Sequence, residues 1–142
     1  MRLQGWENKL SKYLEKTSGR LFKWGKMDCL IFASNACKLV CGVDPMSKKK
    51  SGDPDTIRGA YSTKEDAYKL IKQHRRTITA IMDLHFDRVN PHFAQRGDVV
   101  LYKLEGGKTF GVIWGGKAVF KSFGKGLVMT DVNEKMIAWR VE

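Results

Sequence analysis

The sequence predicts an α+β domain in which N-terminal helices pack on a C-terminal antiparallel β-meander or half-barrel. Apolar residues recur at helical spacing in the first part of the chain, and the period changes to two after Pro91. The turns between the later apolar runs are too short for parallel crossovers. The 142 residues fit one domain, with a helical half over about 1–90 and a sheet over about 91–142.

Two helices are expected before residue 45. Trp6, Leu10, Tyr13 and Leu14 share one helical face, which predicts an amphipathic helix over 5–16. Asp28 is a candidate N-cap for a second helix over about 29–41, which Gly42 ends. Apolar residues cover most of the circumference of this second helix, so we expect it at the centre of the domain.

The middle of the chain predicts a loop and further helices. Residues 44–62 are rich in turn-forming residues and contain three consecutive lysines at 48–50. Ser62 or Thr63 is placed to cap a third helix that runs to His74, and a short helical segment is expected over 78–84.

Five short strands are predicted in the last third of the chain. Apolar runs alternate with Gly-rich or Asn-containing turns, which favours hairpins between consecutive strands. The strands are expected at 99–102, 110–114, 118–120, 127–129 and 137–139.

The chain is strongly basic, with 26 Lys and Arg against 15 Asp and Glu and a net charge of +11. Residues 1–76 carry most of this excess, with 17 basic and 8 acidic side chains. The excess has a solvated basic face as its favoured interpretation, and the alternative is an anionic partner: an acidic protein surface, cell-wall or membrane anions, or nucleic acid. Dedicated nucleic-acid binding is the least favoured, because the sequence has neither a zinc finger nor an aromatic RNA-stacking signature. No apolar run is long enough to span a membrane, and no secretory signal is recognisable at the N-terminus.

The three cysteines point to one candidate site. Cys29, Cys37 and Cys41 match no zinc-ligand spacing, so no metal or cofactor is predicted and the thiols are expected to be reduced. Cys37 and Cys41 share a helical face and are expected to be small core residues. Cys29 opens a helix, where free N–H groups and the helix dipole favour a thiolate. Cys29 is thus the candidate catalytic nucleophile, although a buried structural thiol at the start of the helix is the favoured interpretation.

Several motifs carry a family resemblance. The segment Phe22-x-Trp24-Gly25-x-x-Asp28-Cys29, the strand opening Gln95-Arg96-Gly97-Asp98-Val99-Val100 and the pair Gly111-Val112 resemble the papain-like cell-wall peptidases of the NlpC type. The whole chain is similar to a phage tail-module family of unknown function related to those peptidases. That wider resemblance also includes Leu3-x-Gly5-Trp6-Glu7, Gly42-Val43-Asp44-Pro45, Arg58-Gly59-x-Tyr61-Ser62-Thr63 and Ala138-Trp139-Arg140-Val141.

The resemblance implies a papain-like (NlpC-type) fold, location in the virion tail, and docking to other proteins of the tail tip or hub. The sequence also departs from the pattern of the active peptidases. Active members have a His just before the Gly of the second strand, whereas this chain reads Thr109-Phe110-Gly111. Active members also have a polar residue, often His, on the following strand. The corresponding place in this chain is near Val119-Phe120, which has no titratable group. Because Thr109 cannot act as a base at neutral pH, the resemblance implies a degenerate cysteine-peptidase fold with a structural role.

Two other functions remain open at this stage. The chain could be an active peptidoglycan amidase or endopeptidase, with Cys29 as nucleophile and either His92 or a residue of a partner chain as base. Alternatively it could bind nucleic acid during genome delivery. The remaining conspicuous residues have structural interpretations: Asp28 as an N-cap, Asp98 as a turn residue, Arg96 as its solvated neighbour, and Trp6, Trp114 and Trp139 as core or half-core residues.

Overall fold

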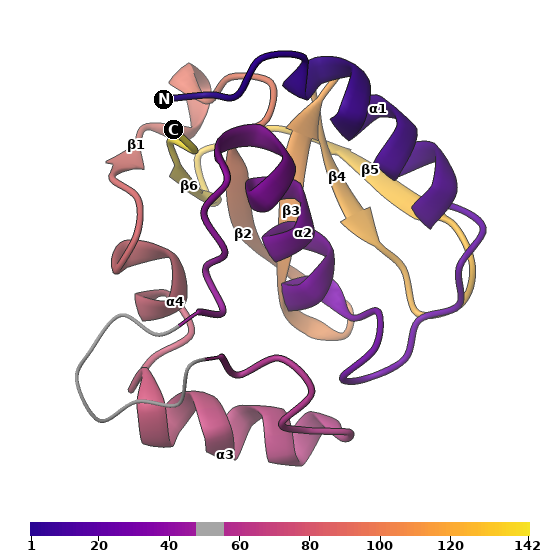
Figure 1. Ribbon diagram of the computed structural model, residues 1–142, viewed down its shortest axis with the longest axis vertical. Helices are drawn as coiled ribbons and strands as arrows, with labels where there is room; N and C mark the ends of the chain where they lie inside the picture. Colours follow the sequence, from indigo (N-terminus) through magenta and orange to yellow (C-terminus); the bar gives the residue numbers. More distant parts are fainter. Residues whose placement is uncertain (48–55) are drawn as a thin grey trace.

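The computed structural model describes residues 1–47 and 56–142 and is an α+β domain, as predicted (Figure 1). The three lysines at 48–50, and with them the centre of the predicted loop, lie outside the described residues. The helices are α1 (Trp6–Thr17), α2 (Cys29–Cys41), α3 (Lys64–His74), α4 (Ala80–Asp83) and the 3₁₀ turn η1 (Pro91–Phe93). The strands are β1 (Arg88–Val89), β2 (Val99–Leu104), β3 (Gly107–Trp114), β4 (Lys117–Lys121), β5 (Leu127–Asp131) and β6 (Ile137–Trp139).

The strands form one antiparallel sheet in the order β1-β6-β2-β3-β4-β5. The predicted meander is therefore correct for β2 to β5 and wrong for β6. After β5 the chain crosses back to the far side of β2, where Val99 pairs with Trp139 and Leu101 with Ile137. The two-residue β1, which was not predicted, adds outside β6 through Arg88 and Val89.

One face of the sheet carries the main core, and α2 is its centre. Figure 1 shows α2 across β3 with α1 beside it. Phe32, Ala36 and Val40 of α2 are fully buried and share one apolar cluster with Phe110 and Val112 of β3. The opposite face of the sheet carries a smaller cluster of Val100, Ile113, Ala118, Phe120, Met136 and Ala138. None of the helices in residues 1–47 and 56–142 is long and apolar enough to cross a membrane.

The ends of the helices follow the expected caps. Asp28 accepts a hydrogen bond from the N–H of Ile31 at 2.9 Å, and Gly42 ends α2 with a left-handed backbone. Thr63 caps α3 by accepting from the N–H of Asp66 at 3.1 Å. The helix expected over 78–84 is shorter and spans Ala80–Asp83.

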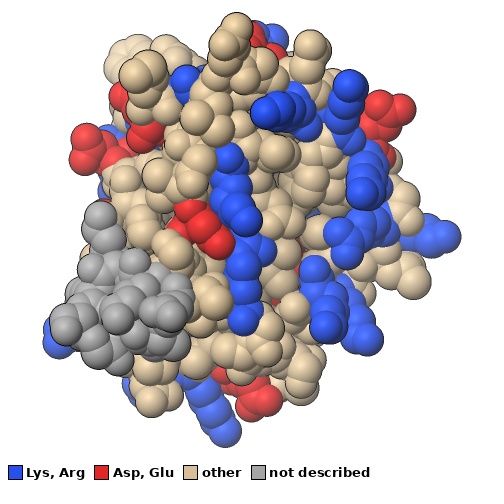
Figure 2. Space-filling model, viewed as in Figure 1, with Lys and Arg blue, Asp and Glu red and all other residues tan. Residues whose placement is uncertain are grey.

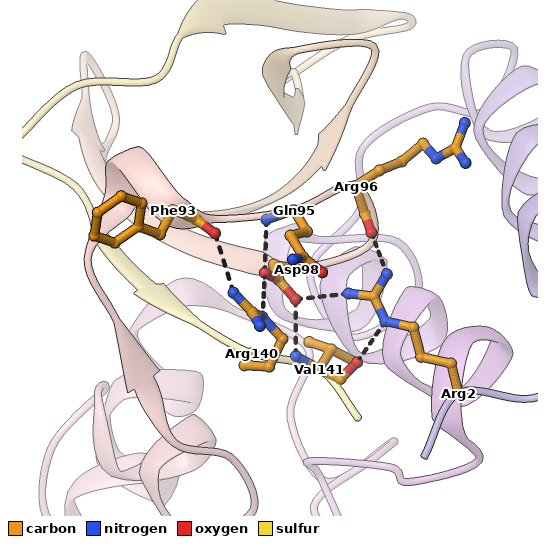
Figure 3. Close-up of polar contacts among 7 residues, drawn as sticks. All are labelled: Arg2, Phe93, Gln95, Arg96, Asp98, Arg140 and Val141. Atoms are coloured by element: carbon orange, nitrogen blue, oxygen red, sulfur yellow. Dashed lines mark hydrogen bonds and ion pairs between the residues drawn. The ribbon is translucent and has the colours of Figure 1, made fainter.

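Asp98 joins both ends of the chain to the start of β2 (Figure 3). Its carboxylate is fully buried and receives hydrogen bonds from Arg2 at 2.8 Å and Arg140 at 3.0 Å. The backbone N–H groups of Gln95 and Val141 also donate to it, at 2.8 and 3.0 Å. Asp98 is thus more than the turn residue expected from sequence, because it is the buried centre of a network that fixes the N-terminus and the segment after β6.

Candidate functional site

The turn before α2 places Cys29. The buried Asp28 carboxylate accepts from the N–H of Gly25 at 2.9 Å and from the hydroxyl of Tyr61 at 2.7 Å, in addition to capping α2. Gly25 has a φ of 81°, and a Cβ there would lie 2.1 Å from the carbonyl oxygen of Tyr61. The Trp24-Gly25 and Asp28-Cys29 pairs are therefore parts of one turn that closes against residue 61. Sequence reasoning missed the partnership with Tyr61, although Tyr61 stands in one of the quoted motifs.

Cys29 lies in a small, mostly apolar pocket of about 30 Å³. That volume has room for about one or two water molecules. Helix α2, the segment before α3, α3 itself and β3 all contribute to its walls. The lining residues are Trp24, Asp28, Cys29, Leu30, Tyr61, Ala67, Tyr68, Ile71, Ile78, Lys108 and Phe110.

The surroundings hold the Cys29 thiol in its neutral form. Loss of hydration is the largest effect and raises its pKa to about 11, and the charge of Asp28 raises the pKa further. The backbone N–H groups of Phe110, Leu30 and Cys29 itself lower the pKa, but by less. The expectation that the helix start would favour a thiolate is therefore wrong here, because desolvation outweighs the helix-start amides. At neutral pH the sulfur remains a thiol and a poor nucleophile.

The structure places Thr109 on the other side of the sheet from Cys29. Alternate residues of a strand point to opposite faces, and Lys108 and Phe110 are the β3 residues that line the Cys29 pocket. Thr109 instead lines a groove on the opposite face together with Phe120. Lys108 and Phe110 are thus the β3 residues that line the pocket.

In the part of the chain that the structure describes, no histidine lines the pocket. His92 is exposed in η1, just before the start of β2. That end of the sheet faces the last turn of α2, since Arg2 binds Asp98 and the N–H of Leu3 donates to the carbonyl of Val40 at 2.7 Å. Cys29 opens the first turn of α2, about 16 Å away along the helix axis. In this structure His92 therefore does not serve Cys29 as the base that the enzyme hypothesis requires.

The other cysteines are consistent with core positions. Cys37 is fully buried and Cys41 is half-buried, and all three cysteines are free. Within residues 1–47 and 56–142, no group of three or more His, Cys, Asp or Glu side chains is placed to hold a metal ion.

Fold and site together define a small α+β domain with a neutral thiol in a tight apolar pocket at the start of its central helix. The chain belongs to the family described as Domain of unknown function (DUF6950), whose model matches residues 1–141. None of the curated proteins matches the chain.

Proposed function

We propose that this protein is a structural or assembly component of a siphophage tail tip, built on a degenerate papain-like (NlpC-type) fold and docking to other tail proteins. The observation that carries the proposal is the Cys29 pocket, in which residues 1–47 and 56–142 place neither an imidazole nor a free carboxylate to accept the proton of the thiol. The carboxylate of Asp28, which is part of the lining, already accepts three hydrogen bonds and raises the thiol pKa rather than lowering it.

The size of the pocket also supports a non-catalytic role. Attack on a peptide carbonyl needs the carbon within about 3–3.5 Å of the nucleophile, with donors around the developing oxyanion. A space of about 30 Å³ bounded by Trp24, Tyr68 and Phe110 is much smaller than the several hundred Å³ of a usual ligand site. Cys29 is partly exposed, but the space beside it is too small to hold a peptidoglycan stem.

Charge on the helical side of the domain supports docking. Figure 2 shows Lys and Arg side chains gathered over the part of the surface where Figure 1 places α1 and α2. Lys9, Lys12 and Lys16 are exposed at i, i+3 and i+7 of α1, and we call them the α1 lysine stripe. A stripe of one sign favours fast and oriented association with an acidic protein surface.

The enzymatic part of the proposal is tested on purified peptidoglycan sacculi. We expect no soluble muropeptides from sacculi incubated with the protein at pH 6–8. Release that disappears in Cys29→Ala would establish the amidase or endopeptidase alternative in its place.

The docking part is tested by charge reversal. Changing the three residues of the α1 lysine stripe to Glu should lower the yield of assembled tails. The matched control reverses three exposed lysines elsewhere, Lys69, Lys72 and Lys135, and should leave the yield unchanged. Equal yields from both triple variants would remove the stripe from the interface.

A further inference from the structure

Strand β5 is an open edge of the sheet. The sheet order leaves β1 and β5 at the two edges, and among the described residues no strand pairs with the outer side of either. The β1 edge has two residues, Arg88 and Val89, and is protected by its shortness and charge. The β5 edge has five residues, Leu-Val-Met-Thr-Asp, without the Pro or Lys that commonly block an edge.

Apolar grooves flank β5 on both faces of the sheet. On the helix side, β5 and α1 enclose a groove of about 370 Å³, whose lining includes Leu14, Val119, Leu127 and Met129. On the opposite side lies a groove of about 350 Å³, whose lining includes Leu104, Phe120, Phe123 and Val128. Met129 is 66% exposed and Phe123 58% exposed, so both grooves have uncovered apolar walls.

This arrangement matches the needs of an added strand. Side chains of an extended segment alternate between the faces of a sheet, so successive residues would enter the two grooves in turn. The free backbone groups of β5 would form the hydrogen bonds to the added strand, and the grooves would determine which of its side chains fit.

The charges around β5 indicate what kind of segment fits. The N–H of Phe22 donates to the carbonyl of Gly124 at 3.0 Å and holds the segment after α1 against the β4–β5 turn. Exposed basic residues therefore surround this end of the edge, namely Arg20, Lys23 and Lys125. Acidic residues also lie near the edge: Asp131 at the other end, which pairs with Lys117, Glu15 in the lining of the first groove and Glu105 in the lining of the second. A second copy would bring the same positive charges together, whereas an acidic segment would complement them.

We propose that β5 is a docking edge for an extended segment of a partner protein, with alternating apolar residues and acidic neighbours, which adds as a further strand. This inference rests on the proposed docking function and deepens it by naming the surface and the chemistry of the partner.

The test uses a fluorescein-labelled nonapeptide in which valine alternates with glutamate and threonine. Its binding is measured by fluorescence anisotropy in 150 mM salt, beside one analogue with lysine for glutamate and another with alternate backbone amides methylated. We expect the acidic peptide to bind at least tenfold more tightly than either analogue. It should also slow amide hydrogen exchange at 127–131.

Two variants locate the site. Met129→Asn removes an exposed apolar side chain from the first groove and should weaken binding at least fivefold. Phe93→Asn removes one of similar exposure, 71%, from η1 at the far end of the sheet and should leave binding unchanged. Both side chains lie mostly in solvent, so both variants are expected to fold.

Equal affinity of the three peptides, or no binding at millimolar concentration, would overturn the inference. So would a homodimer in light scattering that Met129→Asn dissociates, because β5 would then be occupied by a second copy. These results are separate from the sacculus assay. Failure here leaves docking through other surfaces intact, and Cys29-dependent muropeptide release would overturn the proposed function without changing the peptide result.

Discussion

Replacing Asp98 with Asn tests the buried network that joins the two ends of the chain. The change keeps the shape of the side chain but removes its charge, and it places an NH₂ group among donors from Arg2, Arg140 and Val141. Breaking a buried pair costs about 3–5 kcal/mol. The side chains of Arg2 and Arg140 are 18% and 23% exposed, so water can hydrate part of each guanidinium group after the pair is broken. We therefore expect a loss of stability at the lower end of this range, about 3 kcal/mol.

That loss translates into a large change in melting temperature. The unfolding entropy is about 2 cal/mol/K per residue, which gives about 0.3 kcal/mol/K for the whole chain. Dividing the free-energy loss by this entropy predicts that Tm falls by about 10 °C. Urea unfolding followed by circular dichroism measures the free energy. The control, Glu7→Gln, removes an exposed pair with Arg96 at 3.3 Å and should cost less than about 1 kcal/mol. An Asp98→Asn protein within about 1 kcal/mol of the wild type would refute the role given to the network.

Three further predictions concern the turn and the pocket. Lys108→His should place an imidazole at the Cys29 pocket and shift alkylation of the thiol to lower pH. Thr109→His is the control and should leave alkylation unchanged, because residue 109 faces the other side of the sheet. Gly25→Ala should destabilise the fold by more than about 1 kcal/mol, because its φ is 81° and its Cβ would meet the carbonyl of Tyr61; urea unfolding that matches the wild type would contradict this. The Cys29 pKa is raised from 9.0 to about 11, so the unfolded chain loses this proton first and stability should fall as pH rises from 9 to 11. Denaturation curves of Cys29→Ala should show a smaller fall over that interval.

Much of the fold was predictable because the local signals are strong. The Asp28 cap and Gly42 fix both ends of α2, and the short Gly-rich turns fix β2 to β5 as hairpins. The position of β6 was not predictable from such signals. It depends on contacts between distant parts of the chain, above all the hydrogen bonds of Arg140 and Val141 with Asp98.

The position of Cys29 at the start of a helix was predictable from the sequence, but the protonation state of its thiol was not. Cys29 does open the central helix, yet the chemical state of its thiol depends on the segment around Tyr61, on α3 and on Phe110, which pack against it from elsewhere in the chain. The orientation of Thr109 could be judged only once the register of β3 was known, because a shift of one residue exchanges the two faces of a strand.

The most direct test of the central claim is the titration of the Cys29 thiol by iodoacetamide. The experiment uses a Cys41→Ala background, in which Cys37 is fully buried, and a Cys29→Ala protein in the same background gives the blank rate. The account predicts an alkylation rate that is low at pH 7 and rises with a midpoint near 11. A rate that already reaches its plateau below about pH 7 would show a thiolate tuned for catalysis and would contradict the account.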